Sequence, residues 1–445
     1  MPTPSPSADT DVAHAGTESV EVLVEVTDTV TVPYTTGLQR VTRELLARLP
    51  RTGSPAFHPV RWSSACSGYR ELTGDEARLL ADPPERLPRS TRLAARLPGP
   101  VATGVRRALS TAPVRRARAT AARRASDRAE QDRHHLCLGP PDREITTVLL
   151  DLEAAWNDPA PRTELLPAQR RLGVRSAALV ADVLPVLHPE WFDPQLLDDF
   201  DTFLDGHLRH SELLLCISER TRTDLLTVAA DRGVDPTTLR TAVVPLGADL
   251  GPDDGAALHP RFAAVPERFL LQVGTLEPRK NQALSLDVLE AIAPERPDVA
   301  LVLVGKRGWH VDPLVRRIER HPMLGRRLFW FEEVDDEQLA ALYRHATISL
   351  TPALYEGLGV PVMEALHCGT PVVASTGGAL GEAGGPAAEY VDPDDTRGWV
   401  QLVGRLLDDP GEYDRARQRA QAWRAPTWDD AATGVRDAIA EVFSS

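Results

Sequence analysis

Residues 354–375 read LYEGLGVPVMEALHCGTPVVAS, and the fold and function inferred for the chain rest on this stretch. Two glutamates, Glu356 and Glu364, flank a run that holds two glycines, a proline and no other charge. Pro361 suits the first position of a helix, because the N–H that proline lacks would have no partner there. The free N–H groups and the dipole of a helix start stabilise a phosphate. The stretch therefore predicts a loop and a short helix that receive an anion.

The surrounding sequence predicts an α/β fold. Short β-branched runs alternate with helical patterns over most of the 445 residues, which is typical of parallel sheets. A chain of this length exceeds one ordinary core. We therefore predict two doubly wound, Rossmann-like domains. Strands of the first domain are expected at 20–26, 146–152, 176–186, 212–218 and 241–247, and a second series begins near residue 268.

Composition sets the expected domain limits. The first residues are rich in Pro, Ser and Thr and are expected to be disordered. A Pro-, Gly- and Asp-rich segment follows the first domain and is interpreted as a linker. A strongly amphipathic helix with Thr427 as its cap ends the chain, and a return of this helix to the N-terminal domain is left open. The limits are 1–18 for the tail, 19–250 for the N-terminal acceptor domain, 251–262 for the linker, 263–425 for the C-terminal donor domain and 426–445 for the last helix.

Overall charge and cysteine usage exclude several classes of protein. The net charge of −14 argues against nucleic acid as a partner. No apolar run approaches the roughly 20 residues of a membrane span, and the first residues lack the order of a secretory signal. The four cysteines are far apart and form no CxxC pair, so we expect a reduced, cytoplasmic protein without structural zinc.

One segment of the N-terminal domain departs from the acidic average. An insertion at about 82–135 contains, between Arg86 and Ser126, eleven arginines and no acidic residue. It is either a variable insertion or a basic patch, Arg86–Arg124, at an anionic membrane surface, where each basic residue contributes about 1 kcal/mol. The second interpretation would place the protein peripherally at the inner face of the membrane and would suit a lipid-linked saccharide acceptor.

The second half supplies candidate cations. The segment GTLEPRKN, residues 274–281, ends a strand and begins a helix, so Arg279 and Lys280 are expected at the carboxyl edge of the sheet, with the glutamates. Positioned cations stabilise a diphosphate leaving group as it gains negative charge. No metal-ligand cluster is visible, so no metal is expected and these side chains would replace one. The alternative is a solvated helix start.

Four segments of the second half form an ordered set: VGTLEPRKN (273–281), LVLVGKRGW (301–309), VDDEQLAALYRHA (334–346) and the opening stretch. Together they resemble family 4 of the retaining GT-B glycosyltransferases. The glutamate pair with seven residues between corresponds to the E-x7-E motif of that family. The first half is similar to the mannosyltransferase-like branch through VEVTDTV, TTGLQRVTREL, ADVLPVLHPEWF and CISERTRTDLL. The likeness covers about 20–75 and 145–440.

The resemblance implies a GT-B fold, with two Rossmann-like domains facing across a cleft, and a role for each motif. Glu356 would hold hydroxyls of the donor sugar, Glu364 the ribose, and Arg279 with Lys280 the diphosphate. Anomeric configuration would be retained without a metal or a protein nucleophile. The implied donor-binding residues are Gly37, Gly274, Thr275, Arg279, Lys280, Glu356, Gly357, Leu358, Gly359, Val360 and Glu364.

Two departures from the family pattern matter. Ala181-Asp182 stands where many members carry His-Asp, which makes Asp182 our candidate, with Glu356, for the catalytic residues; a turn or cap residue is the alternative. Glu332 or Glu333 stands where glycine is common, which leaves recognition of the base open.

The sequence as a whole favours a retaining hexosyltransferase. It would move a hexose, with mannose favoured, from a GDP- or UDP-sugar to a saccharide or lipid-linked saccharide in polysaccharide or glycoconjugate biosynthesis. A nucleotide-sugar epimerase and a catalytically silent nucleotide-sugar-binding or scaffold subunit remain alternatives. A nicotinamide dehydrogenase lacks support, because no G-x-G-x-x-G follows the first strand.

Overall fold

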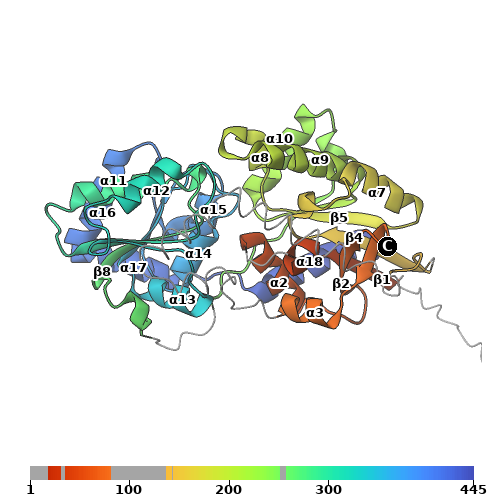
Figure 1. Ribbon diagram of the computed structural model, residues 1–445, viewed down its shortest axis with the longest axis horizontal. Coiled ribbons are helices and arrows are strands. Elements are labelled where there is room, and N and C mark those ends of the chain that lie inside the picture. The colour runs from red at the N-terminus through yellow and green to blue at the C-terminus, as the bar shows by residue number, and fades with distance from the viewer. Residues whose placement is uncertain (1–18, 32–35, 82–136, 143, 251–256, 445) are drawn as a thin grey trace, which may run out of the picture.

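The structure is a computed structural model that describes residues 19–31, 36–81, 137–142, 144–250 and 257–444. These residues form two lobes, each built around one sheet (Figure 1). The N-terminal tail, the arginine-rich insertion with Arg86–Arg124 and residues 251–256 of the linker lie outside the described residues.

The N-terminal lobe contains a seven-stranded sheet in the order β3-β2-β1-β4-β5-β6-β7. All neighbours are parallel except β2 and β3. The central strands are apolar on both faces because helices cover both sides. The strands are β1 (Ser19–Glu25), β2 (Ala56–Ser63), β3 (Gly68–Glu71), β4 (Ile145–Asp151), β5 (Arg175–Val180), β6 (Leu213–Cys216) and β7 (Thr241–Val243).

Helices connect these strands. The predicted strand 176–186 is too long, because β5 ends at Val180 and a helix begins at Leu184. The Asp182 side chain accepts a hydrogen bond from the Leu184 N–H at 3.1 Å, and Pro185 cannot donate to a ladder, so the chain turns here. The helices are α1 (Thr27–Thr31), α2 (Gly37–Arg48), α3 (Gly74–Ala81), η3 (Ala155–Asn157), α7 (Arg162–Arg171), α8 (Leu184–Leu187), η4 (Pro189–Trp191), α9 (Pro194–His210), α10 (Glu219–Asp231) and η5 (Pro236–Thr238).

The C-terminal lobe contains a six-stranded, wholly parallel sheet in the order β10-β9-β8-β11-β12-β13. Its strands are β8 (Arg268–Val273), β9 (Val299–Val304), β10 (Leu328–Phe331), β11 (Ile348–Thr351), β12 (Val372–Ser375) and β13 (Glu389–Val391). Its helices are η6 (Pro260–Phe262), η7 (Pro278–Lys280), α11 (Gln282–Ile292), α12 (Asp312–Glu319), α13 (Asp336–His345), α14 (Val360–His367), α15 (Leu380–Gly384), η8 (Gly385–Ala387), α16 (Thr396–Asp408) and α17 (Pro410–Ala422), and the chain then ends in α18 (Trp428–Phe443). In the part of the chain that the structure describes, none of the helices has the length and apolar character of a membrane span.

Two parallel, doubly wound sheets confirm the predicted fold class. In each sheet the strand order reverses once, between β1 and β4 in the first and between β8 and β11 in the second. Ligands of such sheets bind beyond the carboxyl ends of the strands at this reversal. The loops that follow β8 and β11 are therefore the first place to look for a site.

The last helix returns to the N-terminal lobe. α18 packs against α2 and β6, and Figure 1 shows it within that lobe. Thr427 caps it as predicted, in a capping box with Asp430. The close packing needs a glycine, because a Cβ on Gly247 would lie 2.3 Å from the Trp428 backbone nitrogen. The Trp428 N–H also donates to Asp249 at 2.9 Å.

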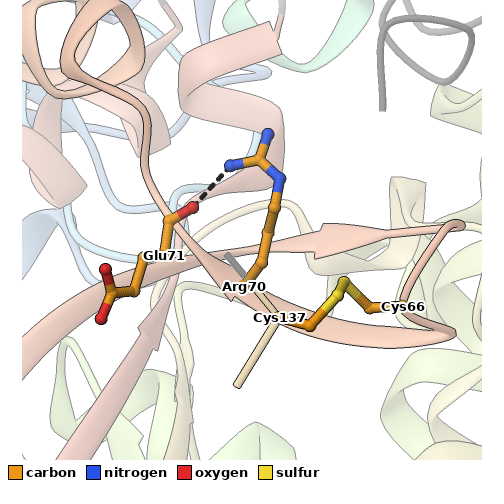
Figure 2. Close-up of a disulfide and its surroundings, with 4 residues drawn as sticks. All are labelled: Cys66, Arg70, Glu71 and Cys137. Carbon is orange, nitrogen blue, oxygen red and sulfur yellow. Dashed lines mark hydrogen bonds between the residues drawn. A yellow bond between two sulfur atoms is a disulfide. The ribbon is translucent and has the colours of Figure 1, made fainter. Parts of the chain in front are cut away.

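The prediction that all four cysteines stay reduced is wrong for one pair. Cys66 and Cys137 form a disulfide, with their Cα atoms 5.7 Å apart (Figure 2). Cys137 forms an antiparallel bridge with Arg70 of β3, which brings the two cysteines together across 71 residues of sequence. Spacing along the chain does not show such a contact. Cys216 and Cys368 are not part of a disulfide.

We predict that Gly247→Ala lowers stability by separating α18 from the N-terminal lobe. Overpacking a tight contact costs about 1–3 kcal/mol, and each kcal/mol lowers the midpoint of thermal unfolding by roughly 2–4 °C for lobes of this size. Thermal unfolding followed by circular dichroism measures the change. Gly74→Ala is the matched control, because nothing lies within 4 Å of the position a Cβ would take there. Equal midpoints for the two variants would contradict the assigned contact.

Candidate functional site

Two loops meet at the strand reversal of the C-terminal sheet. The chain leaves β8 through Gly274, whose φ of +144° suits glycine, and enters the short helix η7. The Lys280 side chain packs over this glycine, 3.5 Å from the position a Cβ would occupy. The Leu354 N–H, beyond β11, donates to the Arg279 carbonyl at 2.7 Å. This backbone bond fixes the predicted cations beside the predicted glutamate; Thr275 lies on the same loop, partly exposed.

The Glu356 carboxylate lies between both cations. One oxygen accepts a hydrogen bond from Arg279 Nη1 at 2.6 Å, and the other accepts one from Lys280 Nζ. Glu277 holds the other side of the guanidinium, with 2.9 Å between its Oε1 and Arg279 Nη2. The structure therefore brings Arg279, Lys280 and Glu356 together as an ion-paired group.

The ion pairs decide the protonation of this group. Burial alone would raise the pKa of Glu356, but Lys280 and Arg279 outweigh it and hold the pKa below its usual value. Burial would lower the pKa of Arg279, but Glu356, Glu277 and Asp182 raise it instead. Burial raises the pKa of Glu277 more than the two cations lower it.

Asp182 reaches the same group from the N-terminal lobe. It follows β5, and its partial burial raises its pKa, a rise that Arg279 and Lys280 oppose and Glu356 adds to. The lobes approach so closely here that a Cβ on Gly357 would lie 2.3 Å from the Ala181 carbonyl oxygen and 3.0 Å from Asp182 Cβ. Gly357 is therefore required for the approach that places Asp182 opposite the cations.

Further hydrogen bonds join the lobes on this side. Ser218 Oγ and Thr221 Oγ1 donate to the Gly357 carbonyl at 2.6 and 3.0 Å. The Tyr355 hydroxyl donates to Asp224, and Glu382 accepts the N–H groups at the start of α10. The predicted anion loop is thus partly an interlobe contact, because the carbonyl of Gly357 faces the opposite lobe.

The start of α14 has the features of an anion-binding end. Gly359 is its N-cap, at φ +102°, and supplies no capping side chain for the first N–H groups. A Cβ there would lie 2.7 Å from Leu380 Cδ2. Pro361 stands in the first turn as predicted, Leu358 is buried and Val360 is partly exposed.

Glu364 lies on the same short helix but has different partners. Its carboxylate accepts hydrogen bonds from Arg40 Nη1 at 2.7 Å and from the Tyr343 hydroxyl at 3.1 Å. Arg40 belongs to α2 of the N-terminal lobe, so this ion pair also crosses between the lobes. The ion pair forms because the Glu364 side chain is only 4% exposed, and a buried carboxylate needs a compensating charge.

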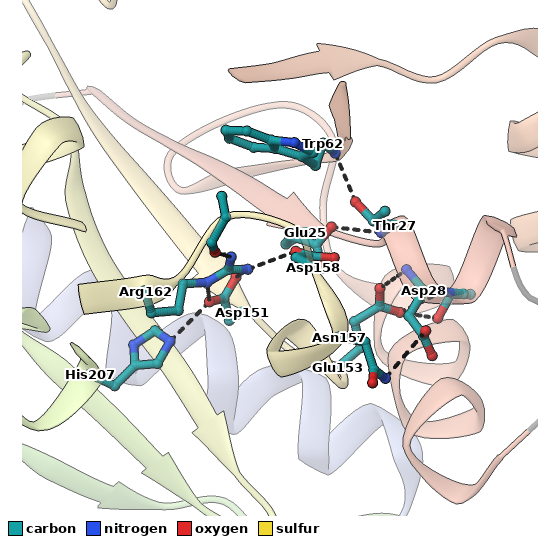
Figure 3. Close-up of polar contacts among 12 residues, drawn as sticks. Glu25, Thr27, Asp28, Trp62, Asp151, Glu153, Asn157, Asp158, Arg162 and His207 are labelled. Atoms are coloured by element: carbon teal, nitrogen blue, oxygen red, sulfur yellow. Dashed lines mark hydrogen bonds and ion pairs between the residues drawn. The ribbon is translucent and has the colours of Figure 1, made fainter. Parts of the chain in front are cut away.

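A buried polar network positions α2, and with it Gly37 and Arg40. Glu153 accepts the N–H groups of Asp28 and Thr29 at the start of α1 (Figure 3). Gln39 then donates to Asp28 at 2.9 Å and completes a capping box with Thr36. Gly37, the first residue of α2, is exposed with open space where a side chain would stand.

Sequence reasoning missed several members of the site. Glu277 lies within the quoted GTLEPRKN segment, and Arg40 within TTGLQRVTREL, but neither segment shows which charges pair. Glu332 and Glu333 are exposed beyond β10. Among the described residues, no three or more His, Cys, Asp or Glu side chains are arranged to hold a metal ion.

Comparison with known proteins agrees with the fold. The profile of the family Glycosyl transferases group 1 matches residues 259–423. The chain is 34% identical over 219 residues to the serotype-specific mannosyltransferase WbdA of Escherichia coli, covering 47% of this chain but only 27% of that protein. It is 30% identical over 271 residues to the O-antigen chain mannosyltransferase B of Escherichia coli, covering 58% of this chain and 68% of that protein.

A solved structure extends the likeness over both lobes. The crystal structure of Anabaena HepE in complex with UDP and glucose aligns with a TM-score of 0.58 and 16% identity, covering 96% of this chain and 100% of that one. At this identity the likeness shows a shared GT-B fold. Together with the family profile and the mannosyltransferase relatives, it supports one conclusion: the chain belongs to the group 1 glycosyl transferases.

Proposed function

We propose that the protein is a retaining hexosyltransferase that uses a nucleoside-diphosphate sugar. The observation that carries the proposal is the group of Arg279, Lys280 and Glu356 at the strand reversal, with Asp182 facing it from the other lobe. Cations, a hydroxyl acceptor and a carboxylate at the junction of two lobes suit the transfer of a sugar from a diphosphate.

In the proposed complex the donor diphosphate takes over the two cations. Arg279 and Lys280 turn from Glu356 toward the phosphate oxygens, and the start of α14, through Leu358, Gly359 and Val360, adds N–H donors and its dipole. The freed Glu356 carboxylate then accepts hydroxyls of the sugar. Gly274 and Thr275 border the phosphates on one side, and Gly37 borders them from the N-terminal lobe.

The proposed reaction breaks the bond between the anomeric carbon and the diphosphate oxygen. The leaving diphosphate gains negative charge, which Arg279 and Lys280 stabilise without a metal. The acceptor hydroxyl attacks from the same face and gives its proton to the departing diphosphate oxygen, so the configuration is retained and no protein nucleophile is needed. Asp182 contacts the reacting sugar or the acceptor hydroxyl.

The names of the relatives support the choice of sugar. WbdA and the O-antigen chain enzyme are mannosyltransferases, and we propose mannose from a GDP- or UDP-sugar, transferred to a saccharide or lipid-linked saccharide. A peripheral contact of Arg86–Arg124 with anionic membrane is part of this proposal. Experiments distinguish the alternatives. An epimerase would change the sugar of the donor without an acceptor, and a silent subunit would bind the donor without consuming it.

We predict that one nucleoside diphosphate stabilises the protein and that Lys280→Ala abolishes the effect. A ligand at a hundredfold over its dissociation constant adds about 2.7 kcal/mol, which is a few degrees for lobes of this size. Thermal unfolding with GDP, UDP, ADP and NAD measures it. A shift with NAD alone would overturn the donor site.

We predict that Lys280→Ala and Glu356→Ala each lower the turnover number by a factor of about 10²–10³, because each removes a charge that acts on the leaving group or the sugar. Release of nucleoside diphosphate with an acceptor present measures the rate. Circular dichroism and the isosteric Glu356→Gln variant separate lost chemistry from lost folding. Arg436→Ala, an exposed change on α18, is the control. Wild-type rates in either site variant would disprove the assignment.

We predict that Asp182 sets the acid limb of the rate profile. Its pKa is raised by burial, so the ionised form is lost, and the rate falls, as pH drops through this raised value. Asp182→Asn should lower turnover by about 10²–10³ and leave a residual rate without that limb. Asp198→Asn, exposed on α9, should keep the wild-type profile. An unchanged acid limb in Asp182→Asn would reduce Asp182 to a turn residue.

A further inference from the structure

The ion pair between Arg40 and Glu364 is not explained by the chemistry proposed above. Arg40 stands one turn into α2, whose start is fixed by the capping box of Thr36 and Gln39. Its guanidinium crosses to the C-terminal lobe and lies 2.7 Å from Glu364 Oε1, with Asp336 3.7 Å from its Nε. The acid side chain is almost fully buried, and the arginine is 21% exposed.

The second partner of Glu364 holds the carboxylate in one orientation. The Tyr343 hydroxyl donates to Oε2 at 3.1 Å, and Tyr343 itself is fixed by Thr370, whose hydroxyl donates to its carbonyl. Each carboxylate oxygen thus has one donor and keeps capacity for a second. The carboxylate therefore keeps acceptor capacity for two further hydroxyls.

We propose that Arg40 is a positioning residue of the donor site: from the opposite lobe it holds Glu364 as a charged acceptor for the two ribose hydroxyls, so that this acceptor is complete only when the lobes are closed. The inference rests on the proposed function, in which Glu364 contacts the ribose. Arg40 acts through Glu364 and needs no contact with the nucleotide.

The charges around Glu364 show why an arginine is needed. Burial raises the pKa of Glu364, and the groups that act on it are Arg40 and Tyr343, which lower it, and Asp336, which raises it. The pKa of Tyr343 is itself raised, by burial first and also by Glu364 and Cys368. Arg40 is the one cation among these groups. Without it the Glu364 carboxyl takes up a proton, and the protonated oxygen then donates a hydrogen bond, so the group no longer accepts from both ribose hydroxyls.

The first test is nucleotide binding as a function of pH. The dissociation constants of GDP and UDP are measured calorimetrically between about pH 6 and pH 8.5 for wild type, Arg40→Met, Arg40→Lys and Arg48→Met. Each unit by which the Glu364 pKa exceeds the pH reduces its ionised fraction about tenfold. Arg40→Met should therefore weaken binding at the acid end of this range, and the loss relative to wild type should shrink, by up to about tenfold per pH unit, as pH rises. Arg40→Lys should restore most of the affinity. Arg48→Met, which removes ion pairs with Glu44 and Asp429 but none with Glu364, should match wild type.

The second test needs no nucleotide. A carboxyl whose pKa is raised by folding favours the folded state when protonated and loses this contribution as pH rises through the raised pKa. The unfolding midpoint of Arg40→Met should thus fall with rising pH relative to Arg40→Met/Glu364→Gln, because the amide does not titrate. Equal midpoints for these two variants at every pH would overturn the inference.

The two tests separate this inference from the proposed function. If wild type binds neither nucleotide, the donor site is wrong, and the stability series alone decides the role of Arg40 in pairing the buried acid. If wild type binds and Arg40→Met binds equally well or more tightly at every pH, Arg40 does not position Glu364 for the ribose.

Discussion

The arrangement of this protein depends on the burial of two carboxylates at the junction of its lobes. A buried carboxylate without a partner costs several kcal/mol, so Glu356 and Glu364 each require a cation. Glu356 finds two cations in its own lobe, in the loop that follows β8. Glu364 finds its cation in the opposite lobe, on α2. The first pairing builds the candidate donor site, and the second ties that site to the closure of the lobes.

Close backbone approaches make this closure possible. Gly357 lets the C-terminal lobe reach Ala181, and Gly247 lets α18 lie against the N-terminal lobe after the chain has crossed back. A side chain at Gly357 would push the lobes apart and break the hydrogen bonds to its carbonyl, and one at Gly247 would push α18 away and break the bond between Trp428 and Asp249. The glycines of the opening sequence stretch therefore serve the lobe contact as well as any anion, which a single sequence does not reveal.

The accuracy of sequence reasoning depended on how local each interaction is. The two sheets follow from runs of apolar residues a few positions long, and Arg279 and Lys280 from one eight-residue segment at a strand end. The pairing of Arg40 with Glu364 and the Cys66–Cys137 disulfide join residues far apart in the chain. Their formation depends on how the lobes and edge strands come together, and no spacing rule expresses that. The predicted strand 176–186 was too long for a local reason. Asp182 and Pro185 end β5 although the apolar pattern continues.

The balance of charge at the site limits what it can accept. Asp182, Glu277 and Glu356 supply three carboxyl groups around the two cations Arg279 and Lys280. With every group ionised the cluster is negative, and a diphosphate would add further negative charge to it. Asp182 and Glu277 both have raised pKa values, so they are the carboxyl groups that take up protons most readily when negative charge approaches. Glu356, whose pKa is lowered, stays ionised and remains an acceptor for hydroxyls. Because turnover is proposed to need ionised Asp182, diphosphate binding should be coupled to proton uptake by Glu277, while Glu356 exchanges its cations for the sugar.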